Sequence, residues 1–282
     1  RLAGRAMTSS VRLGVFGNPV AHSLSPTIHS LFAELRDERI LYERMLATPA
    51  NFPKAVAQFF REGGTGANVT LPFKEQAAQL ANTLTERARV AGAVNTLMKV
   101  SSGFVVGDNT DGEGFVKDLS RKGFHVSGCS LVLLGSGGSA RGVLSALLSL
   151  NPAKVYLVNR TLEKAQALKQ LLVDLSVPGA ENIQVVSNAD SINEKVDAVV
   201  NATSSLHNID IPLPQNFADD AWGYDLMYSD NATHFLKQLE RAGIKSRADG
   251  LGMLIEQAAS SYQLWMSGER PDTTFVMSKI RV

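Results

Sequence analysis

Residues 131–142 read LVLLGSGGSARG, an apolar strand that runs directly into a glycine-rich turn and the start of a helix. Gly135, Gly137 and Ala140 occupy the three small positions of a dinucleotide-binding fingerprint. The first permits a tight turn, the second lets backbone amides approach a pyrophosphate, and the third keeps helix and strand close. A glycine-rich turn alone is a weak signal, but this one has a strand before it and a helix after it. We therefore predict a Rossmann-type domain around this segment.

The sequence beyond the fingerprint alternates between strand and helix. Apolar runs at 131–134, 154–158, 183–186 and 198–200 are separated by helical spacing at 140–150 and 162–175. Such alternation is typical of a parallel sheet covered by helices. The same pattern therefore supports the Rossmann prediction over the whole second half.

The end of the second strand of this domain indicates which dinucleotide binds. An acidic residue about 20 residues beyond the fingerprint would bind a free ribose hydroxyl, whereas a 2′-phosphate requires cationic donors. This chain has Asn159, Arg160 and Thr161 there, followed by Lys164. A guanidinium can form two parallel hydrogen bonds to phosphate, so the sequence favours NADP over NAD.

The first half has its own α/β pattern and a polar loop of unusual composition. We expect strands at 13–17, 41–46, 66–69 and 96–100 and helices at 26–36 and 52–61. The loop reads GANVTLPFK at 66–74, which joins the amide of Asn68, the hydroxyl of Thr70 and the ammonium of Lys74. Pro72 is expected to open the next helix and so to place Lys74 in its first turn. A lone lysine there is better explained as a solvated surface charge unless partners lie elsewhere.

Length and composition favour a globular α/β protein of two domains. The 282 residues correspond to about two domains of ordinary size, and 44% hydrophobic with 20% charged residues allows a substantial core. We predict a first α/β domain with a mainly parallel sheet at 8–110, a Rossmann-type domain at 111–249, and helices at 250–282 that return to the first domain. Met7 is a plausible start, so 1–6 are left out of the expected fold.

Composition also argues against several classes of partner. A net charge of +1, without Lys and Arg clustered among aromatics, provides no positive electrostatic potential that would attract nucleic acid. No signal-peptide pattern and no run long enough to cross a bilayer are present, so no membrane partner is expected. Cys129 is the single cysteine, and its place before 131–134 predicts a buried thiol in a reducing cytoplasm. No metal is expected, because no ligand spacing links the five histidines, His22, His29, His125, His207 and His234.

Taken together, the motifs resemble the shikimate dehydrogenase family over nearly the whole chain from Val11 onward. The markers in chain order are GNPVAHSLSP at 17–26, GANVTLPFK at 66–74, AGAVNT at 91–96, DNTDG at 108–112, GSGGSAR at 135–141, NRT at 159–161, NATSS at 201–205, YDLMY at 224–228 and DGLGMLIEQA at 249–258. The resemblance implies an oxidoreductase that reversibly reduces 3-dehydroshikimate with NADPH on the route to chorismate and the aromatic amino acids.

The same resemblance implies a role for particular residues of the first domain, which becomes the substrate-binding and catalytic domain. Lys74 and Asp111 match the family's catalytic pair, and reduction of a ketone requires a proton as well as a hydride. The positions that match substrate-binding residues are Ser23, Ser25, Asn68, Thr70, Asn95, Tyr228 and Gln257. Ser25 before Pro26 is also a candidate helix N-cap.

Cofactor-binding positions follow from the resemblance in the same way. They are Gly135, Ser136, Gly137, Gly138, Ser139, Ala140, Asn159, Arg160, Thr161, Lys164, Thr203, Leu226, Gly250, Met253 and Glu86. Met253 is equally a candidate for core packing. The chain departs from the family pattern at Ser136 and Ser139, where alanines are usual, at Lys164, where arginine is common, and at Leu206, where glycine usually follows NATSS.

Two other functions compete with this interpretation. A dual quinate and shikimate dehydrogenase using NAD would be expected to carry an acidic residue near Asn159, and a non-catalytic nicotinamide-binding sensor would be expected to lack Lys74 or Asp111. A hydrolase is remote because the sequence has no GxSxG motif. The sequence leaves open whether the protein is a monomer or a homodimer.

Overall fold

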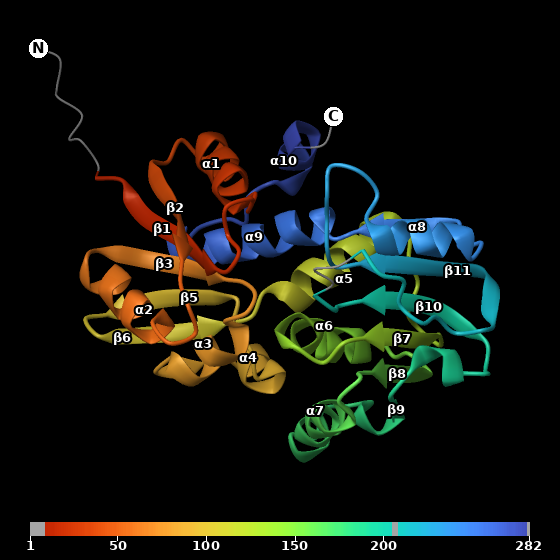
Figure 1. Cartoon of the computed structure of the whole chain (residues 1–282). Helices are drawn as coiled ribbons and strands as arrows, with labels where there is room; N and C mark the ends of the chain where they lie inside the picture. The colour runs from red at the N-terminus through yellow and green to blue at the C-terminus, as the bar shows by residue number, and fades with distance from the viewer. Residues whose placement is uncertain (1–8, 205–207, 281–282) are drawn as a thin grey trace, which may run out of the picture.

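The structure is a computed structural model that describes residues 9–204 and 208–280. Two sheets of six strands each lie side by side, with helices packed around both (Figure 1). The α/β class predicted from the sequence is confirmed. Within the described residues, no helix is long and apolar enough to span a membrane.

The first sheet is mixed but contains more parallel than antiparallel pairs. Its strand order is β2-β1-β3-β5-β6-β4, and β5 alone runs antiparallel to both of its neighbours. The strands are β1 Val11–Gly17, β2 Ile40–Leu46, β3 Gly64–Val69, β4 Thr83–Leu84, β5 Thr96–Ser101 and β6 Phe104–Asp108. The helices of this half are α1 Ser25–Leu35, α2 Phe52–Arg61, α3 Lys74–Leu80 and α4 Glu86–Ala91.

An aromatic cluster fixes the segment that leads into α3. Phe73 is fully buried and stacks on Phe52, with ring centroids 4.5 Å apart and planes 5° from parallel. Phe52 in turn meets the edge of Phe16 from β1 at 5.6 Å. Burying rings of this size stabilises by about 2 kcal/mol each, so the backbone directly before Lys74 is held firmly.

The second sheet is entirely parallel and has the strand order of a dinucleotide-binding fold. Its order, β12-β11-β10-β7-β8-β9, places β7 and β10 at the centre, where the two halves of the sheet diverge. The strands are β7 Ser130–Leu134, β8 Lys154–Val158, β9 Ile183–Val186, β10 Val196–Asn201, β11 Phe217–Asp225 and β12 Ser246–Asp249. The helices are α6 Gly138–Ser149, α7 Leu162–Asp174 and α8 His234–Arg241, with short 3₁₀ turns η1 Ala180–Asn182 and η2 Ala189–Ser191.

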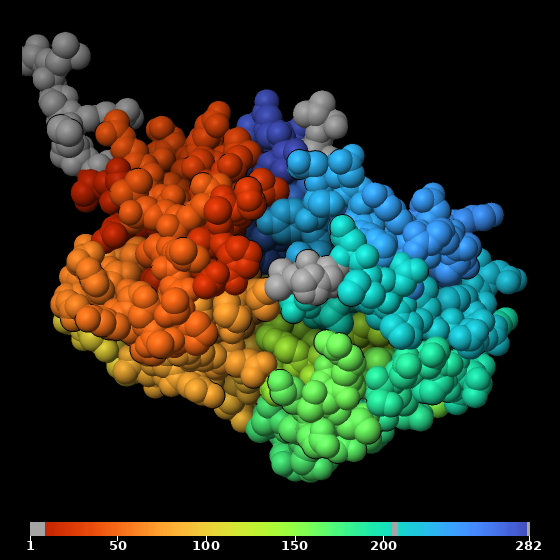
Figure 2. All heavy atoms as spheres, viewed as in Figure 1, coloured from red at the N-terminus to blue at the C-terminus, as the bar shows by residue number. Residues whose placement is uncertain are grey.

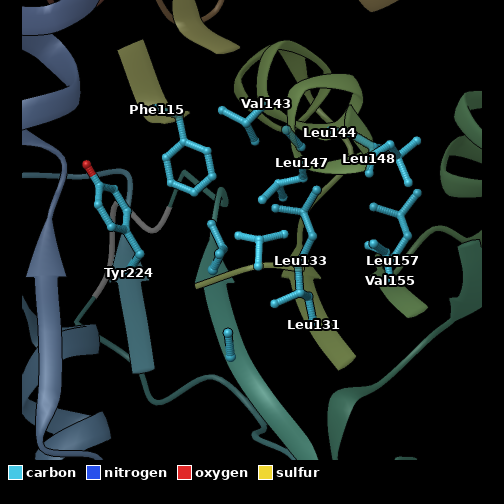
Figure 3. Packing of buried hydrophobic residues seen from close by; sticks show 14 of the residues in the cluster. Phe115, Leu131, Leu133, Val143, Leu144, Leu147, Leu148, Val155, Leu157 and Tyr224 are labelled. Atoms are coloured by element: carbon cyan, nitrogen blue, oxygen red, sulfur yellow. The ribbon is translucent and has the colours of Figure 1, made fainter. Parts of the chain in front are cut away.

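Apolar side chains fill the space between this sheet and its helices (Figure 3). Leu131 and Leu133 on β7 face Val143 and Leu147 on α6, and all four are fully buried. This packing holds the start of α6 directly beyond the end of β7. The glycine-rich turn therefore lies at the carboxyl edge of the sheet, where ligands bind in open α/β folds.

Two helices connect the halves. Helix α5 Asp111–Lys122 follows β6 of the first sheet and packs on both α6 and α9. Helix α9 Leu251–Met266 follows β12 of the second sheet and returns to pack on α1, β3 and β5, with α10 Thr273–Ile280 beside it (Figure 1). A Cβ on Gly114 would lie 2.6 Å from the Gln257 backbone nitrogen, so this glycine lets α5 and α9 approach closely.

Three local predictions are wrong. Pro72 does not open α3, because it lies in the preceding turn and the helix begins at Lys74. Ser25 is the first helical residue rather than the N-cap, which is Leu24. Cys129 is only half-buried, since it precedes β7 and packs at the margin of the core instead of within it. Periodicity also missed β11, β12 and α8, whose sequences carry more polar residues.

Candidate active site

Lys74 and Asp111 form an ion pair where the two halves meet. Lys74 is the first residue of α3 and Asp111 the first of α5, and Nζ lies 2.6 Å from Oδ2. Their side chains are 12% and 5% exposed, so little water competes for either charge. The positive N-terminal end of the α5 helix dipole also stabilises the charge of the Asp111 carboxylate. The partner that the lone lysine required is therefore present, 37 residues away in the chain.

Ser139 connects this pair to the fingerprint. Lys74 Nζ lies 3.4 Å from Ser139 Oγ, and a Cβ on Gly138 would lie 2.8 Å from the Lys74 Cβ. The ammonium thus sits against the first turn of α6. Figure 2 shows the surfaces of the two halves in contact, with a recess along the line where they meet.

Buried amides and hydroxyls surround the ion pair on the side of the first sheet. Asn95 Nδ2 lies 2.9 Å from Asp111 Oδ1 and 3.1 Å from Gln257 Oε1. Asn68 Nδ2 lies 3.2 Å from both the Asn95 carbonyl oxygen and Ser261 Oγ. The three amides predicted to bind the substrate are therefore brought together from β3, from the residue before β5 and from α9.

Sequence reasoning missed four polar residues of this cluster. Ser261 Oγ lies 2.7 Å from Thr96 Oγ1 and 3.2 Å from Thr110 Oγ1, and Tyr42 donates a 2.7 Å hydrogen bond to Asn68. Ser261 is four residues beyond Gln257, so helical spacing could have identified it. Thr96 and Thr110 adjoin predicted residues, whereas nothing local marks Tyr42, which reaches the site from an edge strand.

The loop before α1 brings the predicted carboxylate-binding residues to the same place. Ser23 Oγ accepts a hydrogen bond from the Ser25 backbone amide at 3.2 Å. Tyr228, from the other half, packs against the same apolar cluster as Leu24, and burial raises the pKa of its phenol. A Cβ on Gly17 would lie 2.5 Å from Thr70 Cγ2, so Thr70 packs against the start of this loop.

The fingerprint turn has room for a diphosphate. Gly135 has φ +104°, and a Cβ there would lie 3.0 Å from the Ala202 carbonyl oxygen, so only glycine suits this turn. A Cβ on Gly137 would meet nothing within 4 Å, and no side chain caps α6 at this residue. The first backbone amides of α6 are therefore available to bind an anion. Ser136 and Ala140 of the same turn are buried.

Polar and cationic residues lie at the end of β8, where a 2′-phosphate would bind. Asn159 Nδ2 donates to the Thr161 carbonyl at 2.8 Å and shapes the turn into α7. Arg160 and Lys164 are exposed beside it. The chemistry of this set fits NADP, because it offers two cations and no carboxylate at the strand end.

The carboxyl ends of β10, β11 and β12 bring three further predicted residues together. The Leu226 amide donates to the Asn201 carbonyl at 2.9 Å, and Thr203 Oγ1 donates to Asn201 Oδ1 at 2.6 Å. A Cβ on Gly250 would lie 2.0 Å from the Leu226 carbonyl oxygen, so the glycine permits this approach. Burial raises the pKa of the neighbouring Asp225 to about 6, although hydrogen bonds from Thr233 and other groups oppose the shift.

The remaining two predicted cofactor residues differ in exposure. Met253 is 7% exposed and packs in the core of the second half. Glu86 is exposed, pairs with Arg89, and lines a cavity of about 750 Å³ with Ser145 and residues 175–178. That cavity lies near the C-terminal end of α7, whereas Arg160 precedes the N-terminal end of the same helix. Leu206, where the chain departs from the family pattern, lies outside the described residues.

A metal centre is not found in the described ranges, since no three His, Cys, Asp or Glu side chains in 9–204 and 208–280 are placed to share an ion.

Comparisons with known proteins point to one family. Family models match at residues 15–97 (shikimate dehydrogenase substrate binding domain), 118–215 (shikimate / quinate 5-dehydrogenase) and 250–281 (shikimate 5'-dehydrogenase C-terminal domain). The chain is 57% identical to the shikimate dehydrogenase (NADP(+)) of Idiomarina loihiensis over 98% of its length and 99% of that protein's. It is 44% identical to the enzyme of the same name from Dechloromonas aromatica, over 95% and 96% of the two chains.

A solved structure is similar over the same extent. The shikimate 5-dehydrogenase of Thermus thermophilus, in complex with NADP(H) and shikimate, superposes with a TM-score of 0.80 at 32% identity, covering 94% of this chain and 96% of that one. Identity and coverage of this size, together with the paired lysine and aspartate beside a dinucleotide turn, lead to one conclusion: the chain belongs to the shikimate dehydrogenase family.

Proposed function

We propose that this protein reversibly reduces 3-dehydroshikimate to shikimate with NADPH, and that Lys74 and Asp111 handle the proton. The observation that carries the proposal is the 2.6 Å ion pair placed against the first turn of α6. Curated relatives over the whole chain are NADP-dependent shikimate dehydrogenases, so the reaction lies on the route to chorismate and the aromatic amino acids.

The ion pair supplies the acid–base chemistry. When bound, NADPH supplies the hydride to the carbonyl carbon. Lys74 Nζ gives a proton to the developing alkoxide, and Asp111 Oδ2 holds the ammonium in place and accepts a hydrogen bond from the product hydroxyl. Asn95 holds the other carboxylate oxygen of Asp111, which fixes the direction in which the pair faces.

The surrounding residues orient the substrate. Ser23, Ser25 and Tyr228 are neutral donors suited to the carboxylate; the two serines lie at the start of α1, and Tyr228 packs against the same apolar cluster as Leu24 between them. The groups that read the ring hydroxyls are proposed to be Asn68, Thr70, Asn95 and Gln257. Amides donate and accept at once, and a site of this kind rejects analogues that lack a hydroxyl, because its own polar groups would be left unpaired.

The cofactor is proposed to lie across the carboxyl edge of the second sheet. Amides at 135–140 would hold the diphosphate, and Arg160 with Lys164 would hold the 2′-phosphate.

We propose three segments: 8–110 for substrate and catalysis, 111–249 for NADP, and 250–282 packing back on the substrate domain. We also propose a cytoplasmic monomer or homodimer. The unpaired thiol of Cys129 supports the compartment, and sedimentation of a larger assembly would contradict the oligomeric state.

Substitution of Lys74 tests the mechanism. Lys74→Ala should lower kcat by roughly 10²–10⁴ while the KM for shikimate changes much less, because general acid catalysis is lost and binding is largely kept. The assay follows NADPH formation from shikimate and NADP. Lys99→Ala is the matched control, since its ammonium bonds the Phe60 carbonyl oxygen away from the ion pair. Near-normal turnover of Lys74→Ala would remove it from the mechanism, and turnover with quinate and NAD but not with shikimate and NADP would contradict the proposed reaction.

A further inference from the structure

Two residues of the DNTDG segment at 108–112, Asp108 and Asn109, have no role in the chemistry proposed so far, although both are buried. Asp108 ends β6, and Asp111 opens α5. The Asp108 carboxylate accepts hydrogen bonds from Thr85 Oγ1 at 2.6 Å and from the Asn109 backbone amide at 2.7 Å. Asn109 Oδ1 accepts a hydrogen bond from the Asp111 backbone amide at 3.0 Å. Each side chain of this turn therefore fixes the backbone one or two residues nearer to Asp111.

Arg87 holds this turn from helix α4. Its Nε and Nη2 donate to the two carboxylate oxygens of Asp108 at 2.7 and 2.8 Å, which makes a bidentate pair. Its Nη1 donates to Glu113 Oε2 at 2.8 Å. Glu113 lies in the first turn of α5, two residues beyond Asp111, whereas Asp108 lies three residues before it. One guanidinium therefore binds the chain on both sides of the proposed catalytic carboxylate.

Both the charge and the shape of the Arg87 head group matter for this contact. Burial acts to raise the pKa of Asp108, but hydrogen bonds from Arg87 and Thr85 outweigh it and lower this pKa, so the carboxylate stays charged. The planar guanidinium presents its donors in a fixed fork, which sets the orientation of the carboxylate that it binds. A lysine would supply the same charge as a point, without a fixed direction. The direction in which α5 begins therefore depends on the fork of Arg87.

We propose that Arg87 is a positioning residue that holds the Asp111 carboxylate in its ion pair with Lys74. It acts through Asp108 and Glu113, which flank Asp111 in the chain. The inference rests on the proposed function, because the ion pair is the proposed acid–base group. Its consequence is that a change at Arg87 lowers turnover and leaves substrate binding largely intact, since the residues proposed to bind shikimate lie on neither α4 nor α5.

Steady-state kinetics of Arg87→Ala test the proposal, with NADPH formation from shikimate and NADP as the assay. The kcat should fall by about fivefold to fiftyfold, because a misplacement of about 1 Å at a catalytic group can cost about a hundredfold in rate. The KM for shikimate should stay within about twofold of the wild-type value. Arg89→Ala is the matched control, since Arg89 is an arginine of the same helix that pairs with Glu86 on the surface. This control variant should keep the wild-type kcat.

Chemical rescue separates positioning from a general effect on stability. The Arg87 side chain is 41% exposed and lines the same cavity of about 750 Å³ as Glu86, together with Thr85 and Asp108. A small cation can therefore reach the place that the shortened side chain leaves. Millimolar guanidinium chloride should raise the kcat of Arg87→Ala by at least about threefold and leave the wild-type kcat unchanged, because the cation has the same planar donors. Ammonium chloride at the same concentration has the charge without the fork and should restore less.

Arg87→Lys replaces the alanine variant if that protein is too unstable to purify. It keeps the charge and loses the bidentate geometry, so its kcat should fall by about threefold to tenfold with little change in KM.

Three results would overturn the proposal: a kcat within about twofold of wild type in the purified Arg87 variant, an equal loss in Arg89→Ala, or a kcat of Arg87→Ala that guanidinium does not restore. If the wild-type protein does not oxidise shikimate with NADP at all, the proposed function fails instead, so the two failures are distinct.

Discussion

Replacing His29 by phenylalanine should remove a specific loss of stability in acid. The ring is fully buried on α1, and within the described residues neither of its nitrogens has a hydrogen-bond partner. Burial lowers its pKa to about 3, although the neighbouring Asn68 side chain acts weakly in the opposite direction. The folded protein therefore keeps this ring neutral at pH values where the unfolded chain, with a histidine pKa near 6.5, takes up a proton.

The sign and size of the effect follow from that difference. Because the folded pKa is depressed, the contribution of His29 to the free energy of unfolding is complete above about pH 6.5 and is lost as the pH falls toward 3. Each pH unit inside this window costs up to about 1.4 kcal/mol. Between about pH 7.5 and pH 5 the loss should be about 2 kcal/mol.

The assay is urea unfolding at steps between about pH 7.5 and pH 5 for the wild-type protein and for His29→Phe. The variant keeps an aromatic ring to stack on Tyr42 but has no group that titrates, so its decline in stability should be about 2 kcal/mol smaller over this range. His125→Gln is the control, since it also removes one histidine but at an exposed position. Parallel declines for wild type and His29→Phe would refute the argument that burial alone keeps this ring neutral.

Two further substitutions test the cofactor site and the contact between α9 and the first sheet. Arg160→Asp should lower kcat/KM for NADP relative to NAD by roughly tenfold to a hundredfold, because it removes a charge-assisted bond and adds repulsion; an unchanged ratio would place the 2′-phosphate elsewhere. Gly66→Ala should lower the free energy of unfolding by about 1–3 kcal/mol, because the added Cβ would lie 2.2 Å from Nε1 of the buried Trp265. Equal thermal and urea unfolding of Gly66→Ala and wild type would show that Trp265 moves aside without cost.

The arrangement of the site explains why its polar groups are buried so completely. Asp111, Asn95, Gln257 and Asn68 are each 6% exposed or less, and they bond one another in a continuous chain. A buried polar group costs free energy unless it is paired, so each member holds the next in a single orientation. The result is a set of donors and acceptors whose directions are fixed before a substrate arrives.

Local patterns made much of the molecule predictable. The fingerprint at 131–142 predicted the turn between β7 and α6, because glycine and small residues are required by the backbone geometry of that turn itself. Helical and strand spacing predicted most elements, but missed β11, β12 and α8, whose polar residues blur the pattern. Pro72 and Ser25 were misplaced by one or two residues, since the end of a helix depends on the packing of its neighbours as well as on local preference.

The sequence by itself determined the α/β class, the two sheets, the dinucleotide turn and the identity of Lys74 and Asp111 as a pair worth seeking. Only the tertiary structure decided that the pair is made, at 2.6 Å, and that Tyr42 and Ser261 belong to the same buried cluster. The physical reason is the sequence separation over which each kind of interaction acts. Turn geometry and periodicity are properties of a few consecutive residues, whereas the hydrogen bond between Asn68 and Ser261 spans 193 positions and exists only because α9 folds back across the first sheet.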